Sequence, residues 1–292
     1  MLRVGLFLLT NLAILVVISI TFNVLGLSRV IAQGGINFPS LLVMAAIFGM
    51  GGSIISLLMS KSLARRATGA RIIHQPSNQA ERWLVETVAR QAKVAEIGMP
   101  EVAVYQSPAP NAFATGANKN AAMVAVSTGL LQAMHADEIE AVLGHEVSHI
   151  ANGDMVTLSL IQGVVNTFVI ALAWVVGSVV DRALSGGRGR GIGPGFWLGR
   201  MLAELVLGFL ATLIVLAFSR WREFRADAGG AKLAGRRKMI AALQRLGSLN
   251  EPSRLPASLN AFGINGGHGA LARLLMSHPP LDARIRALQE RS

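Results

Sequence analysis

The chain of 292 residues contains no cysteine. This absence excludes disulfide bonds, thiolate zinc sites, iron–sulfur clusters and a cysteine nucleophile, so a metal would have to be held by histidine, aspartate or glutamate. The sequence also lacks the Gly-x-x-x-x-Gly-Lys phosphate loop, so nothing in it indicates an ATP-driven motor or another nucleotide-binding protein.

Charged residues are scarce as well. Asp, Glu, Lys and Arg make up 15% of the chain, against about a quarter of a typical soluble protein. Hydrophobic residues reach 52%, and four apolar stretches are long enough to cross a bilayer, approximately 4–27, 38–59, 156–180 and 201–218. The sequence therefore predicts a protein of the lipid bilayer. The first stretch is too long for a signal-peptide core, which favours an uncleaved anchor.

The net charge of +11 does not by itself indicate nucleic-acid binding. Arginines gather after the second and fourth apolar stretches, as expected for segments that face the cytoplasm and the anionic lipid headgroups. The loop 181–200 also contains four arginines, although alternation would place it outside. Either the first two stretches set the orientation, or the third and fourth form a hairpin that does not fully cross.

The most informative pattern is His145-Glu146-Val147-Ser148-His149. Residues four apart lie on the same face of an α-helix, so His145 and His149 can bind one Zn²⁺. Glu146 beside them can reach a water molecule at the metal and act as its base. The alternative is that both are ordinary histidines of a core or a surface.

The flanking residues predict a helix in water. Asp137 and Glu140 are typical of a capping-box start, and Asn152-Gly153 favours a helix end. The apolar residues recur near the helical period, at Ile139, Val142, Leu143, Val147 and Ile150. Acidic residues in the first turn would be costly in lipid, which argues against an intramembrane protease of the site-2 type.

A catalytic zinc needs a third protein ligand. Glu223 and Asp227 share a helical face, so Glu223 could bind the metal while Asp227 accepts a hydrogen bond from a ligating histidine. Alternatively, both could pair on a solvated face with neighbouring arginines. The competing third ligands are Asp154, His268 and His278.

The first polar block also contains strand signals. A helix is predicted over 79–97, and strands over 102–105 and 123–126. Between the strands lies an extended segment bounded by turn residues, Asn111-Ala112-Phe113-Ala114-Thr115-Gly116. It could be an ordinary edge strand, or one to which an extended peptide substrate adds through main-chain hydrogen bonds.

Several motifs together resemble the HtpX family of bacterial inner-membrane zinc metalloproteases, relatives of the CAAX prenyl proteases. They are the segments 145–154, 223–227 and 111–116, and Ser277-His278-Pro279-Pro280-Leu281 with Arg284 downstream. The resemblance covers essentially the whole chain. It implies that His145, His149 and Glu223 ligate Zn²⁺, that Glu146 is catalytic, and that the family acts in membrane-protein quality control and stress response with a cytoplasmic active site.

The predicted fold is a membrane α+β protein with two transmembrane hairpins and a mainly helical, zincin-like catalytic domain containing a small sheet. A hairpin returns the chain to the side it left, so the two polar blocks can form one domain. The predicted parts are 1–60, 61–154, 155–218 and 219–292.

The predicted function is zinc-dependent endoproteolysis of membrane and unfolded proteins, with one zinc per chain and no nucleic-acid or nucleotide partner. His278 and Arg284 could contact the substrate or stabilise the oxyanion, or make structural contacts only. The non-enzymatic alternative is a transporter or scaffold with a structural metal. Glu204 is its only membrane-embedded ionisable residue, and it can pair with Arg200 one turn earlier.

Overall fold

The computed structural model describes residues 16, 19–20, 23–24, 26, 37–186, 192–249 and 276–290. The chain divides into two compact units. The first, here the apolar unit, comprises Met1–Ser56 and Leu158–Val215. The second, here the polar unit, comprises Leu57–Thr157 and Leu216–Ser292.

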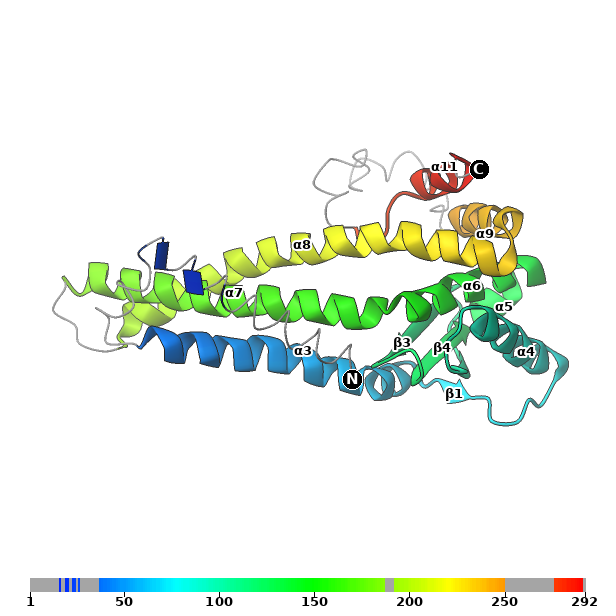
Figure 1. Ribbon diagram of the computed structural model, residues 1–292, viewed down its shortest axis with the longest axis horizontal. Helices are drawn as coiled ribbons and strands as arrows, with labels where there is room; N and C mark the ends of the chain where they lie inside the picture. The colour runs from blue at the N-terminus through cyan, green and yellow to red at the C-terminus, as the bar shows by residue number, and fades with distance from the viewer. Residues whose placement is uncertain are drawn as a thin grey trace, which may run out of the picture. The chain divides into compact units, whose positions relative to one another are not determined.

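Three helices in the described part of the chain are long and apolar enough to cross a membrane. They are α3 (Phe38–Thr68), α7 (Asp154–Leu184) and α8 (Pro194–Ala234), and they contain the second, third and fourth predicted spans (Figure 1). Nearly all of the first predicted span, 4–27, lies outside the described residues. The helical membrane class is therefore confirmed, while two complete hairpins and the four domain ranges stay predictions.

Small residues allow the helices of the apolar unit to approach closely. A Cβ atom at Gly49 of α3 would lie 2.5 Å from Thr167 Oγ1 of α7 and 2.6 Å from the Thr167 backbone nitrogen. A Cβ atom at Gly177 of α7 would likewise lie 2.8 Å from the Phe196 carbonyl oxygen of α8. Glycine at these points removes the side chain that would separate the helices, which is a common packing solution in lipid.

The hairpin between α7 and α8 is closed by a side chain. Asp181, near the end of α7, accepts hydrogen bonds from the backbone N–H groups of Gly193 and Phe196 at 3.3 and 3.1 Å. The carboxylate thereby satisfies donors at the start of α8. Nearly two turns into α8, Arg200 pairs with Glu204 at 2.8 Å, as the sequence predicts.

The polar unit is built on a small mixed sheet. Among the described residues, four strands lie in the order β1-β2-β4-β3, with β2 and β4 parallel and both outer pairs antiparallel. Their bounds are Arg71–Ile72 for β1, Glu101–Tyr105 for β2, Ala112–Gly116 for β3 and Ala122–Ser127 for β4. Both predicted strands are confirmed, and each is one or two residues longer than expected.

Helices cover one face of this sheet, where alternate residues of the strands enter the main core. The core includes Leu84 and Val88 of α4, Leu143 and Val147 of α6, and Leu243 of α9. The bounds are α4 (Gln79–Val94), α5 (Thr128–Ala133), α6 (Ala136–Asn152), α9 (Arg236–Leu249) and α11 (Leu281–Glu290). The other face carries a smaller cluster that includes Tyr105 and Met123, packed against Ala64 near the end of α3.

Helix α6 carries the two motif histidines, and its apolar stripe is buried as predicted. Its end at Asn152 is also confirmed, because Gly153 adopts the left-handed conformation (φ 71°) that glycine accepts without strain. The predicted start is wrong by two residues. The capping residue is His135, whose backbone N–H donates to Glu138 at 2.8 Å, so the acidic partner is Glu138 rather than Glu140.

Candidate metal centre

Three side chains from two helices meet inside the polar unit. Helix α6 supplies His145 and His149, and α8 supplies Glu223. One ligand atom from each lies within 4.8 Å of the other two, and all three residues are buried. The Nε2 atom of His145 is 3.5 Å from Glu223 Oε2, and that of His149 is 3.4 Å from Glu223 Oε1. The third residue expected from the sequence therefore lies beside both histidines.

Two further carboxylates lie at the opposite nitrogens of the histidines. The Nδ1 atom of His145 is 2.9 Å from Asp227 Oδ1, and that of His149 is 2.6 Å from Asp154 Oδ2. A carboxylate at Nδ1 fixes the orientation of the ring and leaves Nε2 available as a ligand. Asp227 thus lies where its predicted hydrogen bond with a ligating histidine requires.

From the sequence, Asp154 is predicted only as a competing third metal ligand. In the structure it is 2% exposed and occupies the outer side of His149, so its position matches that of Asp227 on His145. A signal was available, because Asp154 directly follows the glycine that ends α6. A side chain placed there begins α7 and can turn back to the last turn of α6.

Burial and charge shift the pKa values of these groups strongly. Burial by itself would lower the pKa of His145, but hydrogen bonds with Asp227 and Glu223 raise it to about 9. Burial would raise the pKa of Glu223, but contacts with His145, His149 and His278 hold it well below its usual range. The site therefore keeps Glu223 in its carboxylate form, which a metal ligand requires.

The donor set fits a divalent metal ion. Glu223 Oε1 is buried and accepts no hydrogen bond within the described part of the chain, although it faces His149. The two histidine Nε2 atoms lie 3.1 Å apart, where two nitrogen lone pairs would repel unless a proton or a cation stands between them. Two imidazoles and one carboxylate match the ligand type and number of catalytic zinc sites.

Glu146 lies next to His145 on α6 and is only partly buried. No hydrogen bond or ion pair to its carboxylate occurs among the described residues. It lies near enough to raise the pKa of both motif histidines through its negative charge. The side chain is therefore close to the ligand cluster and available to a water molecule.

The segment 276–290 contributes two side chains to the surroundings of the site. His278 Nδ1 lies 2.7 Å from Glu223 Oε2, and its side chain is 59% exposed. Arg284 of α11 is buried and pairs with both Asp227 oxygens, through Nε at 2.7 Å and Nη2 at 2.6 Å. A substrate contact of Arg284 stays a prediction, and this double pair favours the structural alternative.

The alternative of a solvated face for Glu223 and Asp227 is wrong, because their exposures are 0% and 1%. The nearby arginines have other contacts. Arg220 donates to the carbonyl of Met276 at 2.8 Å, and Arg225 lies over the ring of Trp221 at 5.1 Å. The remaining rival ligand, His268, lies outside the described residues.

Strand β3 contains most of the predicted substrate segment. It pairs with β4 alone, which makes it an outer strand of the described sheet. Ala112 and Ala114 face the core around α6, whereas Phe113 contacts the Tyr105 ring on the opposite face at 5.6 Å. The edge position agrees both with an ordinary edge strand and with a strand to which a substrate adds. Asn111, the first residue of the predicted segment, directly precedes β3.

Comparison with known proteins identifies the family. Residues 78–292 match the model of peptidase family M48. The chain belongs to peptidase family M48. The expected resemblance is confirmed by relatives of nearly equal length. The chain is 61% identical to "Protease HtpX homolog" of Nitrosomonas eutropha over 289 residues, and the alignment covers 98% of this chain and 99% of that protein. It is 58% identical to "Protease HtpX" of Thioalkalivibrio sulfidiphilus over 290 residues, covering 98% of each.

A solved structure agrees in fold with this M48 member. The crystal structure of S. mikatae Ste24p superimposes with a TM-score of 0.60 at 16% sequence identity. The match covers 97% of this chain and 66% of that protein, and at this identity it supports the fold alone. Family membership makes the chain a metallopeptidase that hydrolyses peptide bonds, and its apolar helices make it a multi-pass membrane protein. The predicted class of enzyme is confirmed.

Proposed function

We propose that this M48 peptidase is a zinc-dependent endopeptidase whose metal is held by His145, His149 and Glu223. The observation that carries this proposal is the arrangement of paired carboxylates behind the histidines. Asp227 and Asp154 occupy both Nδ1 atoms, so both Nε2 atoms face the buried Glu223 carboxylate. Such ordering of the outer contacts is a general property of metal-binding histidines.

A zinc ion held by His145, His149 and Glu223 would supply Lewis-acid chemistry, which polarises a scissile carbonyl and activates a water molecule at neutral pH. Glu146 takes the proton of that water and passes it to the leaving amine nitrogen, which requires a carboxylate free of other partners. His278 is exposed beside Glu223, so it can donate a hydrogen bond to the carbonyl oxygen as negative charge develops there. Arg284 keeps Asp227 in place behind His145.

The substrate is proposed to bind as an added strand on β3. An extended peptide along this edge would use main-chain groups of 112–114 for hydrogen bonds, because the N–H and C=O groups of Asn111 already pair with Ser127. It would lie beside α6, against which β3 packs. Main-chain recognition is tolerant of sequence, which suits unfolded polypeptides. We therefore propose misfolded or damaged membrane proteins as substrates, cleaved in quality control and stress response.

The proposed location is the bacterial inner membrane, with the polar unit in the cytoplasm. The relatives named above come from bacteria. Basic residues follow the apolar runs of both α3 and α8, at Lys61, Arg65 and Arg66 and at Arg220, Arg222 and Arg225. Such residues favour the cytoplasmic side.

The test is metal analysis and digestion on the same purified samples. Full-length wild type, E223A and E146Q would be prepared in detergent, assayed for bound zinc, and incubated with casein. We expect one zinc per chain and cleavage for wild type, loss of both for E223A, and retained zinc without cleavage for E146Q. Proteolysis by E146Q at the wild-type rate would refute the role of Glu146, and stoichiometric zinc in E223A would refute the ligand set.

A further inference from the structure

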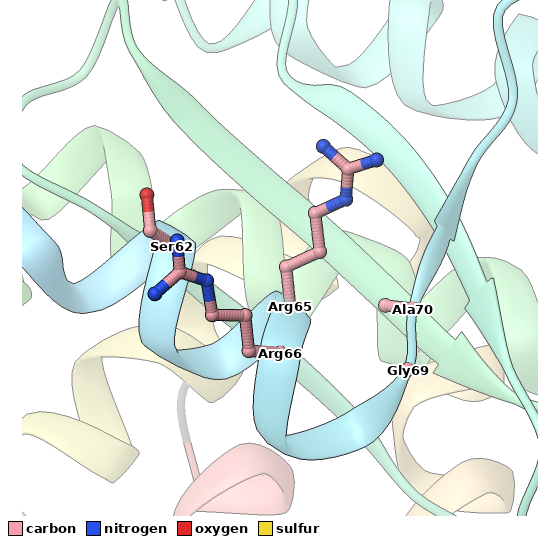
Figure 2. A pocket seen from close by; sticks show the side chains of 5 residues that line it. All are labelled: Ser62, Arg65, Arg66, Gly69 and Ala70. Carbon is pink, nitrogen blue, oxygen red and sulfur yellow. The ribbon is translucent and has the colours of Figure 1, made fainter.

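A basic hollow lies in the polar unit, at the end of α3, and shares no lining residue with the candidate metal centre. It is lined by Ser62, Arg65, Arg66, Gly69 and Ala70 (Figure 2). The first three are spaced i, i+3 and i+4, so they lie along one face at the end of α3. Gly69 directly follows the helix in a left-handed conformation (φ 65°). Buried Ala70 closes the hollow towards the sheet, where it packs with Ala103 and Ala64.

The two arginines of this hollow differ from the other cations of the same segment. Lys61 pairs with Glu101 at 2.8 Å, and Arg71 pairs with Glu81. In the described part of the chain, by contrast, no acidic side chain lies within ion-pair distance of Arg65 or Arg66, and both are exposed. Figure 2 shows the Arg66 side chain turned towards Ser62 and the Arg65 side chain extended in another direction. Two neighbouring positive charges without an acidic partner in the protein attract an anion from outside it.

The position along α3 indicates the source of that anion, provided that α3 crosses the membrane. The apolar run of the helix ends at Met59, and Arg65 follows six residues later, about 9 Å along the axis. The polar headgroup zone on each side of the hydrocarbon core is roughly 5–8 Å thick. An arginine side chain can extend back over that remaining distance. The guanidinium groups of the hollow can therefore reach the depth of lipid phosphates.

We propose that this hollow binds the phosphodiester of an anionic phospholipid headgroup. The guanidinium groups of Arg65 and Arg66 donate hydrogen bonds to the phosphate oxygens, which is the geometry that guanidinium matches best. The Ser62 hydroxyl supplies a further donor. Gly69 leaves the site open, since a Cβ atom there would meet nothing within 4 Å. A lipid held here would fix the end of α3, which packs through Ala64 on the sheet of the polar unit.

The experiment measures lipid binding to the detergent-solubilised full-length chain and needs no enzymatic activity. Short-chain phosphatidylglycerol would be titrated into wild type, R65Q/R66Q and R236Q/R237Q, with phosphatidylcholine and inorganic phosphate as further probes. The second double variant, R236Q/R237Q, removes the same charge from two consecutive exposed arginines at the start of α9. Each basic residue near an anionic surface changes affinity roughly fivefold, so we expect about 25-fold weaker phosphatidylglycerol binding in R65Q/R66Q and no change in R236Q/R237Q.

A further variant, S62W, keeps both guanidinium groups and fills the hollow, and it should also bind phosphatidylglycerol several-fold more weakly. It decides the question if R65Q/R66Q fails to fold. Equal weakening in both double variants would show diffuse surface charge and overturn the proposal, as would unchanged binding in R65Q/R66Q and S62W. Inorganic phosphate bound as tightly as phosphatidylglycerol would assign the hollow to a free anion instead of a lipid.

Discussion

The Oδ2 atom of Asp154 lies 2.6 Å from Nδ1 of His149, across the break between α6 and α7. This contact gives the second motif histidine the carboxylate partner that Asp227 gives the first. Both partners come from outside α6. The orientation of the histidines therefore depends on α7 and α8, the two helices of the apolar hairpin, which carry Asp154 and Asp227.

The first prediction concerns this contact. D154N should weaken zinc affinity about 10- to 100-fold, because the amide no longer fixes and polarises the His149 ring as a carboxylate does. Competition with a chromophoric chelator would measure the affinity. The matched control is D137N, which changes an exposed aspartate near the start of α6 and should bind zinc as wild type. Equal affinity in all three proteins would show that Asp154 has no role at the metal.

The second prediction concerns the pair between Arg284 and Asp227. R284M removes one partner and leaves the Asp227 carboxylate buried with less compensation, which typically costs about 3–5 kcal/mol. We expect a clearly lower unfolding temperature in detergent. R286M changes an exposed arginine on the same helix and should leave the unfolding temperature within about a degree of wild type. A similar fall in both would point to a general effect of changing α11.

The third prediction is a pH dependence. The pKa of Glu81 is lowered to about 2, from an ordinary value of 4.5, by the backbone N–H and hydroxyl of Ser77 and by Arg71. Because the folded pKa is the lower one, its contribution to stability is complete above pH 4.5 and is lost as the pH falls towards 2. The difference in unfolding free energy between wild type and E81Q should therefore be constant above pH 5 and shrink below it. A difference independent of pH between 6 and 3 would contradict this linkage.

The fourth prediction concerns helix packing in the apolar unit. G49V should destabilise the unit by about 1–3 kcal/mol or more, because the added side chain meets the backbone of Thr167, which has little freedom to move. G52V lies on the same helix, where an added Cβ atom meets nothing within 4 Å. Thermal unfolding in one detergent would compare the two, and an equal loss of stability would show that β-branching in the helix is responsible.

Much of the local structure could be predicted because it depends on neighbouring residues. The helical period of the apolar residues and Gly153 define most of α6, and the spacing of His145 and His149 follows directly. The cap at His135 was missed because histidine is not a usual capping residue, whereas Asp137 two residues later is. The predicted helix at 79–97 ends earlier, at Val94, because Glu96 adopts a left-handed backbone conformation that the sequence does not reveal.

The site was harder to predict because its parts are far apart in the chain. The spacing of Glu223 and Asp227 indicated a helical face but could not decide between metal binding and solvent, and burial decided against solvent. The role of Asp154 depends on how α7 turns after Gly153, and that of Arg284 depends on where α11 docks. For Asp154 the local sequence offers only its place directly after Gly153, and for Arg284 it offers no signal.

Helix α8 runs without interruption from Pro194 through the apolar segment to Ala234, so Glu223 lies deep within a 41-residue helix. A fragment that began at the polar residue Ser219 would place Glu223 in the first turns, where backbone N–H groups lack partners and the helix frays. The apolar segment of α8 thus stabilises the helix that carries the metal ligand, in addition to anchoring the chain in the membrane. Trimming the chain to a water-soluble fragment should therefore cost metal affinity even where every ligand is retained.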